Sequence, residues 1–428
     1  DGPFGNFYVW SDTDEKYSDA RIIFLDTEKS NWKWDEERGQ YYWHRFFHHQ
    51  PDLNFDEPRV IDEMFNAVRF WMDMGIDGFR LDAVPYLVEE DGTNCENLSG
   101  THEILKDLRA MVDREYPGRI LLCEANQWPD DVVEYFGAGD ECQMAFHFPV
   151  MPRLFMALRQ HSRMSISDIL ARTPQIPDGC QWGTFLRNHD ELTLEMVTAQ
   201  EREYLWDQYA PEDRMRCNLG IRRRLATLVG NDQDQIRLLH AMLLTLPGSP
   251  VLYYGDEIGM GDDPWLPDRD GVRTPMQWDN SPSAGFSDAP PEKFHLPVID
   301  QFGYRPARVN VERQMEDPSS QLVWLRSMLA VRRRYPVFGT GEFIDLGGDD
   351  EAILAFLRRD RASTILCLAN LSPDERRYVG VLPQFGGRRV VNMLRDEPFG
   401  PLDPAGTVEY DLAGWGFAWI LLHHEEDH

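Results

Sequence analysis

The sequence predicts an α/β fold in which short strands alternate with amphipathic helices. Two further observations favour a closed (β/α)₈ barrel of the TIM type over an open sheet. Most of the expected strands end in polar side chains, and polar groups gathered at the C-terminal ends of parallel strands are typical of barrel active sites. The alternative, a doubly wound open sheet, is disfavoured because no glycine-rich phosphate loop follows any of these strands.

The chain begins with an irregular segment, residues 1–57, which is rich in Trp, Tyr, Asp and Asn. A helix over Pro58–Met74 follows, because its apolar residues recur with the spacing of one helical face. Asp56 is expected to cap this helix, Pro58 suits its first turn, and Gly75 ends it.

After this helix, strands and helices continue to alternate. The expected strands are 75–83, 119–125, 142–150, 181–191 and 249–259, and the clearest helices between them are 101–116 and 234–246. A barrel needs eight strands, and residues 1–57 are too few for three more βα units of roughly thirty residues each. We therefore expect barrel strands four to eight here. The first three are expected upstream of Asp1, in a chain that looks truncated at its N-terminus.

From about Gly341 the pattern changes to short apolar runs separated by turn-forming residues. This pattern predicts an all-β sandwich after a last barrel helix at Ser320–Tyr335. The expected domains are part of an inserted irregular domain at 1–48, the C-terminal part of the barrel at 49–338, and the sandwich at 339–428.

The composition limits the partners. Lys and Arg total 43 against 73 Asp and Glu, a net charge of −30, which disfavours nucleic acid and acidic membrane surfaces but not a neutral sugar. The six cysteines are scattered without a CxxC pair, so we expect a reducing, cytoplasmic setting rather than a disulfide framework or a zinc site. We find neither a signal peptide nor a membrane-spanning run.

Three carboxylates end expected strands: Asp82 in GFRLDA, Glu124 in LLCEA and Asp190 in RNHDE. Cleaving a glycosidic bond with retention requires a nucleophilic carboxylate and a carboxylic acid about 5 Å apart. Arg80 shares a strand face with Asp82 and is expected to keep it ionised. The apolar residues before Glu124 are expected to raise its pKa towards that of a working acid. His189 can donate a hydrogen bond to a sugar hydroxyl.

Four segments resemble the signature regions of the α-amylase superfamily, glycoside hydrolase family 13: QPDLN (50–54), GFRLDAVPY (78–86), EAN (124–126) and RNHDE (187–191). The resemblance implies that Asp82 is the nucleophile, Glu124 the general acid/base and Asp190 the stabiliser of the oxocarbenium-like transition state. It also implies that Arg80 and His189 bind substrate.

Longer stretches resemble the branch of this superfamily that interconverts maltose and trehalose: residues 1–35, 41–58, 144–159 and 252–278. The implied reaction is an intramolecular glucosyl transfer in a closed pocket, with Gln50 lining that pocket and some leakage to glucose. Two alternatives stay open. One is an α-glucosidase-type hydrolase, which shares every catalytic residue. The other is a non-catalytic chain, either an inactive fragment or a scaffold.

The same resemblance implies a structural calcium ion and no organic cofactor. The implied ligands are Asp52, Tyr86, Leu87 and Glu89, the middle two through backbone carbonyls, and such oxygen ligands suit Ca²⁺. The superfamily's first signature, which contributes a substrate-contacting His and a calcium-ligating Asn, does not occur in this chain. We therefore expect an incomplete pocket and metal site. A homo-oligomer is left open.

Overall fold

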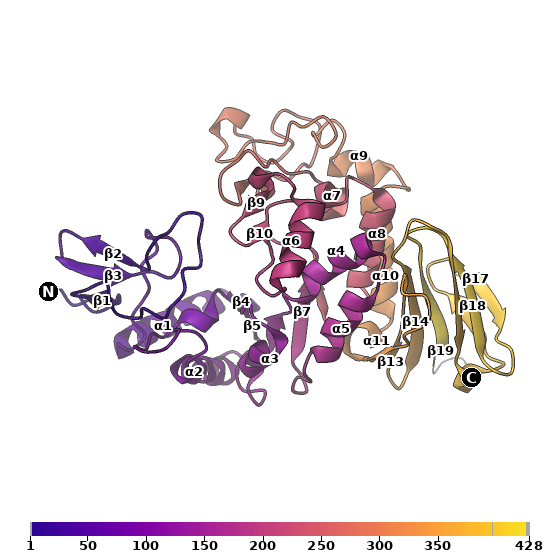
Figure 1. Ribbon diagram of the computed structural model, residues 1–428, viewed down its shortest axis with the longest axis horizontal. Coiled ribbons are helices and arrows are strands. Elements are labelled where there is room, and N and C mark those ends of the chain that lie inside the picture. The colour runs from indigo at the N-terminus through magenta and orange to yellow at the C-terminus, as the bar shows by residue number, and fades with distance from the viewer. Residues whose placement is uncertain (1, 396, 425–428) are drawn as a thin grey trace. The chain divides into compact units, whose positions relative to one another are not determined.

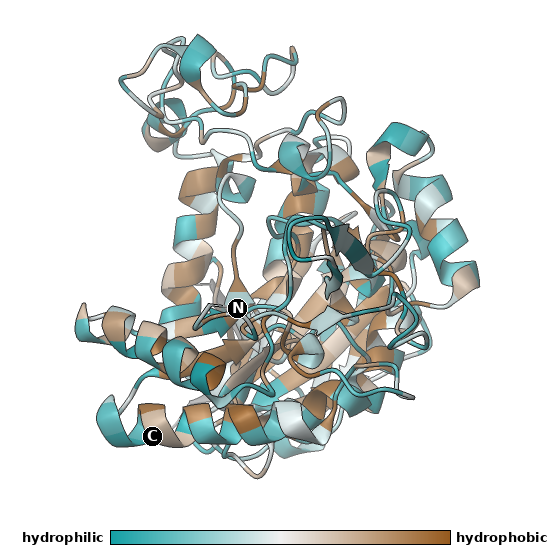
Figure 2. Cartoon of the chain, turned by 90° about the vertical axis from the view of Figure 1, so that its left-hand side faces the viewer, coloured by the Kyte–Doolittle hydropathy of each residue, from teal (hydrophilic) through white to brown (hydrophobic). Residues whose placement is uncertain are grey.

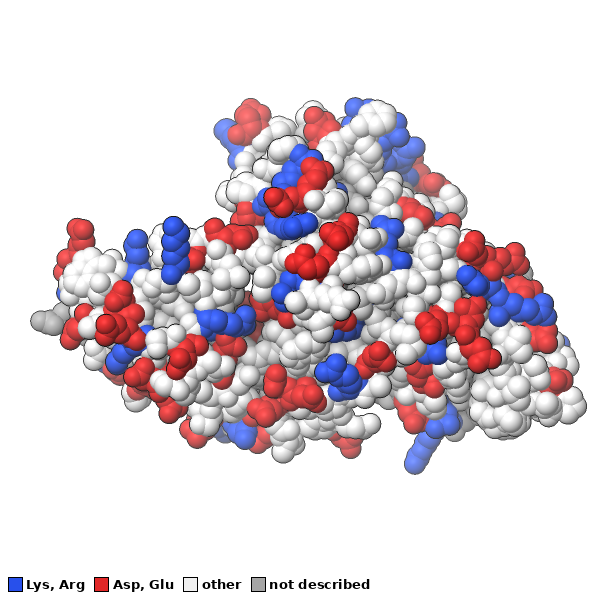
Figure 3. Space-filling model, viewed as in Figure 1, with Lys and Arg blue, Asp and Glu red and all other residues white. Residues whose placement is uncertain are grey.

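The computed structural model describes residues 2–395 and 397–424. The chain forms two compact units, one comprising Asp1–His147 with Pro174–Trp182 and the other Phe148–Thr173 with Gly183–His428 (Figure 1). Acidic and basic side chains are interspersed over the face drawn in Figure 3. Among the helices of the described part, none is both long and apolar enough to cross a membrane.

The N-terminal segment of the first unit contains a small antiparallel sheet. Its strands are β1 (Trp10–Ser11), β2 (Trp32–Asp35) and β3 (Gln40–Trp43), in the order β1-β3-β2. Trp32 and Trp43 are buried opposite each other, with ring centroids 4.9 Å apart. These strands are only two to four residues long, which is too short for a clear alternation of apolar and polar residues.

The first predicted helix is α1 (Pro58–Asp73), but its cap differs from the expectation. Glu57, not Asp56, is the N-cap residue, and its carboxylate accepts a hydrogen bond from the N–H of Arg59. Asp56 lies one residue too early to reach the first free N–H groups of the helix. Gly75 follows the helix at φ 96°, a left-handed conformation that favours glycine.

The rest of the first unit contains β4 (Gly78–Leu81), α2 (Ser99–Glu115), β5 (Ile120–Cys123) and β6 (Met144–Phe146). The strands are parallel, with Arg80 opposite Leu122 and Cys123 opposite Ala145. β4 and β5 pack closely, since a Cβ on Gly78 would lie 2.2 Å from the Ile120 carbonyl oxygen. Figure 2 shows brown and teal residues alternating along the helices, the colouring expected of amphipathic helices.

Strand β7 (Gln181–Phe185) begins in the first unit and continues in the second. In the second unit its end pairs in parallel with β11 (Ser249–Val251). The longer helices of this unit are α4 (Val150–Gln160), α5 (Met164–Arg172), α6 (Ala199–Tyr209), α8 (Gln233–Leu243) and α10 (Gln321–Arg334). A separate small sheet contains β8 (Leu192–Thr193), β9 (Arg216–Cys217) and β10 (Gly220–Ile221).

The C-terminal part of the second unit is all-β, as predicted. Six strands form one antiparallel sheet in the order β12-β13-β14-β19-β16-β17, and β15 pairs separately with β18. Their bounds are β12 Glu342–Asp345, β13 Ile353–Arg359, β14 Ser363–Asn370, β15 Arg376–Val381, β16 Arg389–Asn392, β17 Glu397–Pro401, β18 Thr407–Leu412 and β19 Phe417–His424. The acidic end of the chain lies outside the described residues.

Candidate active site

The first cluster of catalytic side chains lies in the first unit, at the C-terminal ends of β4 and β5. These strands are parallel neighbours, so Asp82 and Glu124 leave the sheet at the same edge. The guanidinium of Arg80 bridges the two carboxylates, with Nη1 2.8 Å from Asp82 Oδ1 and Nη2 2.6 Å from Glu124 Oε2. This contact agrees with the strand face that Arg80 and Asp82 were predicted to share, and the expected effect of Arg80 on Asp82 stays a prediction.

The electrostatics of this cluster are set by Arg80. Burial alone would lower the pKa of Arg80, but the carboxylates of Glu124 and Asp82 outweigh it and raise that pKa. The Asp82 side chain is 72% exposed, whereas that of Glu124 is only 17% exposed. A substrate can therefore reach Asp82. The effect that apolar neighbours were expected to have on Glu124 stays a prediction.

The backbone turns sharply directly after Asp82. Ala83 has φ 49° and ψ 38°, a left-handed conformation that is unfavourable for alanine. Its N–H donates to Glu124 Oε2 at 3.4 Å. Strain of this kind persists where the surrounding structure imposes it, often at functional sites.

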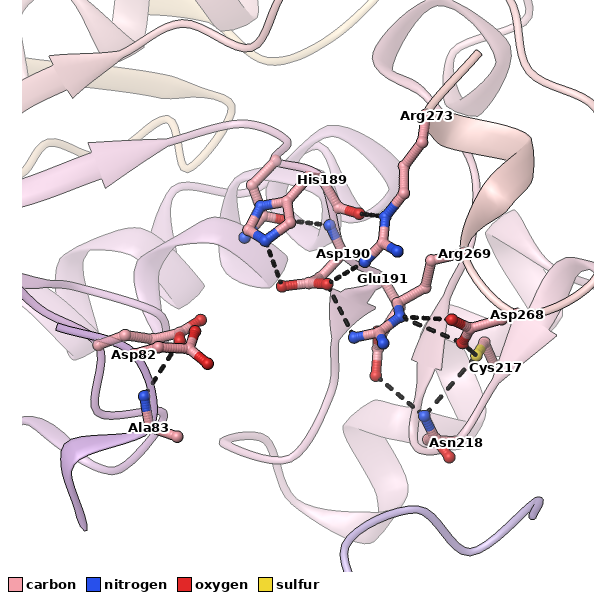
Figure 4. A network of polar contacts seen from close by, with 12 residues as sticks. Asp82, Ala83, His189, Asp190, Glu191, Cys217, Asn218, Asp268, Arg269 and Arg273 are labelled. Atoms are coloured by element: carbon pink, nitrogen blue, oxygen red, sulfur yellow. Dashed lines mark hydrogen bonds and ion pairs between the residues drawn. The ribbon is translucent and has the colours of Figure 1, made fainter. Parts of the chain in front are cut away.

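The second cluster lies in the second unit, on the loop that follows β7. Asp190 Oδ1 accepts hydrogen bonds from Arg269 Nη1 and Arg273 Nη2, both at 2.8 Å. Asp190 Oδ2 lies 3.3 Å from His189 Nε2 (Figure 4). Two arginines from one distant segment therefore fix one oxygen of this carboxylate, and its other oxygen faces the histidine.

Side chains rather than regular secondary structure hold the backbone of this loop. Arg187 is buried, and its Nη2 donates to the Asp190 carbonyl at 2.7 Å. The N–H of Asp190 donates to Asn188 Oδ1 at 3.0 Å, and Arg273 Nε donates to the His189 carbonyl at 2.6 Å. Positioning of this kind requires folding of segments more than eighty residues apart in sequence.

A buried acid lies behind Asp190. Burial raises the pKa of the Glu191 carboxyl, and the charge of Arg269 opposes this rise. Arg269 Nη1 is 3.9 Å from Glu191 Oε2, and its Nε is 3.1 Å from Asp268 Oδ1. Asn218 Nδ2 donates to Glu191 Oε1 at 3.3 Å. Arg269 is thus shared by three acidic side chains.

Arg269 and Arg273 are functional candidates that the sequence did not single out. They lie in the segment DRDGVRTPMQW (268–278), which carried part of the family resemblance. Neither strand position nor spacing indicated that they contact Asp190. Only their occurrence in that shared segment could have suggested a role.

The family "Alpha amylase, catalytic domain" matches residues 2–211 and 221–341, and "Maltogenic Amylase, C-terminal domain" matches 346–419. The chain belongs to the α-amylase family. The solved trehalulose synthase MutB from Pseudomonas mesoacidophila MX-45 has the same fold, with a TM-score of 0.74, 22% identity, and coverage of 98% of this chain and 78% of that one. The fold is therefore the (β/α)₈ type of this family with a C-terminal β-domain.

Within the α-amylase family, the chain is grouped with the trehalose synthases. The trehalose synthase of Pimelobacter sp. (strain R48) is 58% identical over 438 residues, which cover 99% of this chain and 76% of that protein. The "Trehalose synthase/amylase TreS" of Mycobacterium tuberculosis (strain ATCC 25618 / H37Rv) is 57% identical, with coverage of 100% and 72%. The chain thus spans about three quarters of the length of these relatives.

Gln50 was predicted to line the substrate pocket. It lies on an exposed turn of the first unit. Its backbone N–H donates to the Phe47 carbonyl at 2.8 Å, which closes that turn. Its side chain is accessible, and its contact with substrate stays a prediction.

Two of the four predicted calcium ligands are carboxylates with buried oxygens in the first unit. Asp52 Oδ2 and Glu89 Oε1 are buried and have no hydrogen-bond partner among the described residues. Burial raises the pKa of Asp52 to about 7, although Arg45 opposes this. Burial and then the charge of Asp52 raise the pKa of Glu89 well above its ordinary value.

The other two predicted ligands are adjacent on the chain. Tyr86 ends a short 3₁₀ turn (Val84–Tyr86), and Leu87 follows it directly. The described residues contain no group of three or more His, Cys, Asp and Glu side chains that could hold a metal. Two carboxylates whose buried oxygens lack partners fit a hard cation better than a transition metal, and the role of the two carbonyls stays a prediction.

Proposed function

We propose that this chain interconverts maltose and trehalose by intramolecular transfer of a glucosyl group with retention of configuration. The carboxylate pair Asp82 and Glu124, bridged by Arg80 at two adjacent strand ends, is the observation that carries this proposal. The names of the relatives that are 57–58% identical support trehalose as the product, and maltose as the other sugar comes from the family resemblance.

In the first step, the exposed carboxylate of Asp82 attacks the anomeric carbon of the non-reducing glucosyl unit. Glu124 donates its proton to the glycosidic oxygen, so that glucose leaves and a covalent glucosyl–Asp82 ester forms. Glu124 then acts as a base. It takes the proton from the anomeric hydroxyl of the released glucose. That oxygen attacks the anomeric carbon of the bound glucosyl group and breaks its bond to the Asp82 oxygen, which gives trehalose and free Asp82.

For Asp190 and His189, the family resemblance predicts a role in stabilising the positive charge that develops in the transition state of each step. The transition state resembles an oxocarbenium ion, so a carboxylate that cannot rotate stabilises it without reorganising. The arginine contacts on Asp190 Oδ1 provide that rigidity. His189 is half exposed and can donate to a sugar hydroxyl.

The second candidate function is hydrolysis by the same residues. One relative carries the name "Trehalose synthase/amylase", so both outcomes occur in the names of this branch. The two functions differ in whether water or the retained glucose attacks the anomeric carbon of the glucosyl–Asp82 intermediate. Exclusion of water favours the transfer.

Incubation of the chain with maltose, with maltose, trehalose and glucose resolved over time, tests the proposal. We expect trehalose as the main product with a minor amount of glucose, and neither product with Asp82→Asn. Glucose without trehalose would support the hydrolase. Product formation that is unchanged in Asp82→Asn would contradict both functions.

We further propose that Asp52, Glu89 and the carbonyls of Tyr86 and Leu87 hold Ca²⁺ as a structural ion. Protons compete with calcium, because the pKa of Asp52 is about 7 and that of Glu89 is also raised. Without metal, a carboxyl with a raised folded-state pKa stabilises the fold below its unfolded pKa and loses this contribution as pH rises through the folded value. Ca²⁺ bound to the ionised carboxylates restores the stability that is lost as pH rises.

Calcium is therefore expected to raise the thermal midpoint of chelator-treated protein more at pH 8 than at pH 5.5. Differential scanning fluorimetry with and without CaCl₂ measures this shift. The double variant Asp52→Asn/Glu89→Gln is the matched control and should show no calcium-dependent shift at either pH. A shift of equal size in that variant would place the calcium elsewhere.

A further inference from the structure

A buried carboxyl group lies in the turn that follows β11, and the proposed mechanism gives it no role. Asp256 begins the 3₁₀ turn Asp256–Ile258, and only 3% of its surface is exposed. Its Oδ1 is buried without a hydrogen-bond partner among the described residues. Burying a carboxylate is costly unless a cation compensates its charge, so the position of Asp256 needs a reason.

Two buried arginines supply the opposite charge. Arg224 is buried, and its Nη1 lies 3.7 Å from Asp256 Oδ1. Arg187 is also buried. Burial lowers the pKa of Arg187, and the charge of Asp256 is the strongest of the effects that oppose this, whereas Arg224 adds to it by repulsion. Two like charges share one buried site, and the carboxylate of Asp256 acts on both of them.

Hydrogen bonds fix Arg224 against the turn that carries Asp256. Arg224 Nη1 donates to the Tyr254 carbonyl at 2.7 Å, and its backbone N–H donates to Asp262 Oδ2 at 2.6 Å. Gly255 permits this approach, because a Cβ at this position, where φ is 87°, would lie 3.0 Å from Arg224 Nη1. Arg224 therefore cannot move away from its like-charged neighbour without breaking these contacts.

Arg187 connects this group of charges to the second catalytic cluster. Its Nε donates to the Arg223 carbonyl at 2.6 Å, and its Nη2 donates to the Asp190 carbonyl at 2.7 Å. Its Nη1 is buried and has no hydrogen-bond partner among the described residues. Backbone carbonyls accept its N–H groups but do not neutralise its charge. The carboxylate of Asp256 supplies that neutralisation, which keeps Arg187 at the Asp190 backbone.

We propose that Asp256 is a positioning residue that holds Arg187 in place and, through Arg187, the backbone of Asp190. Without its negative charge, Arg187 and Arg224 repel each other in a buried site, where the low dielectric strengthens that repulsion. The hydrogen bond from Arg187 to the Asp190 carbonyl is then lost, and Asp190 no longer stabilises the transition state without reorganising. This inference rests on the proposed function, which gives Asp190 that role.

The charge of Asp256 depends on pH in the neutral range. Burial raises its pKa to about 7, the charges of Arg224 and Arg187 oppose this rise, and the neighbouring Glu257 adds to it. Glu191 also acts on Arg187, but it is present in every variant compared below. Asparagine has the shape of a protonated aspartate and cannot ionise. Asp256→Asn should therefore differ from the unsubstituted chain at pH 8 and resemble it at pH 5.5, whereas a loss of packing would be equal at both pH values.

Hydrogen–deuterium exchange of peptides covering residues 186–193 measures this effect without any turnover. The N–H of Asp190 is protected by its hydrogen bond to Asn188 Oδ1. At pH 8 we expect this loop to exchange about tenfold faster in Asp256→Asn, with β14 unchanged, and less than about twofold faster at pH 5.5. In the unsubstituted chain alone, protection of the loop should fall from pH 8 to pH 5.5 after correction for intrinsic exchange rates. An unchanged loop, or faster exchange throughout the chain at both pH values, would overturn the proposal.

Glu257→Gln is the matched control, because it removes a carboxyl group from the same turn. Glu257 lines a groove of about 310 Å³ together with Tyr254, Leu325 and Arg326. It donates no hydrogen bond to the Asp190 loop, and we expect neither the exchange of residues 186–193 nor the rate of turnover to change by more than about twofold. An effect equal to that of Asp256→Asn would mean that any carboxylate of this turn suffices, and would overturn the specific role of Asp256.

Turnover measures the consequence for catalysis. The rate of the unsubstituted chain on maltose, divided by that of Asp256→Asn, is expected to be about ten at pH 8 and below about two at pH 5.5. This ratio cancels the titration of Asp82 and Glu124, which both chains share. A chain that forms no trehalose but shows the pH-dependent loosening of the loop would refute the isomerisation and support the positioning by Asp256. Trehalose formed equally fast by Asp256→Asn at pH 8 would do the reverse.

Discussion

Replacing Glu124 with glutamine is expected to slow turnover of maltose about 10²–10⁴-fold, the usual cost of losing a general acid. The same variant should lose far less in the first step with α-glucosyl fluoride. Fluoride leaves without a proton, whereas the glucose of maltose needs one on its glycosidic oxygen. A rapid initial release of fluoride is therefore expected, followed by slow turnover, because Glu124 is also the base of the second step. Fluoride release and sugar products, followed in parallel, measure the two steps.

Asp82→Asn is the comparison that separates the two roles. This variant should lose activity with both substrates, by about 10⁴-fold or more, because no leaving group compensates for a missing nucleophile. Azide should accelerate the second step of Glu124→Gln and give α-glucosyl azide, since azide needs no base. Equal losses on maltose and the fluoride in Glu124→Gln would mean that Glu124 is not the proton donor.

The catalytic cluster of the first unit could be predicted because it depends on short-range rules. Two parallel strands that are neighbours in the sheet must end at one edge, which brings Asp82 and Glu124 together. Strand alternation places Arg80 on the same side as Asp82. The 2.8 and 2.6 Å contacts of Arg80 are the geometric consequence.

The arginines on Asp190 could not be predicted in this way. Arg269 and Arg273 approach Asp190 from an irregular segment whose path depends on tertiary contacts such as those of Arg222. No periodicity encodes such a path. A resemblance to a family marks the segment as shared, but it does not say which of its side chains contacts which carboxylate.

Element boundaries were also predicted less well than element types. The strand expected over 249–259 is only the three residues of β11, and Gly255 at φ 87° then precedes a 3₁₀ turn at Asp256–Ile258. Apolar residues beyond Val251 made the run look like one strand. The sequence of β17, EPFGP, lacks a strand pattern, because two prolines and a glycine interrupt it.

Replacing Arg269 with alanine is expected to destabilise the chain by about 3 kcal/mol at pH 8, since a buried carboxylate then loses its cation. Without Arg269, the already raised pKa of Glu191 rises further. A carboxyl with a raised folded-state pKa is stabilising below its unfolded pKa and loses that contribution as pH rises, so the penalty should be smaller at pH 5. Urea denaturation at both pH values measures it.

Adding Glu191→Gln to Arg269→Ala separates stability from catalysis. Glutamine has nearly the shape of glutamate and carries no charge, so the double variant should regain much of the lost stability and its dependence on pH should weaken. Turnover of maltose should stay low, because Asp190 still lacks one of the two arginines on its Oδ1. If activity returned together with stability, Arg269 would contribute only by balancing the charge of Glu191. If neither returned, the 3.9 Å contact between Arg269 and Glu191 would not be the source of the penalty.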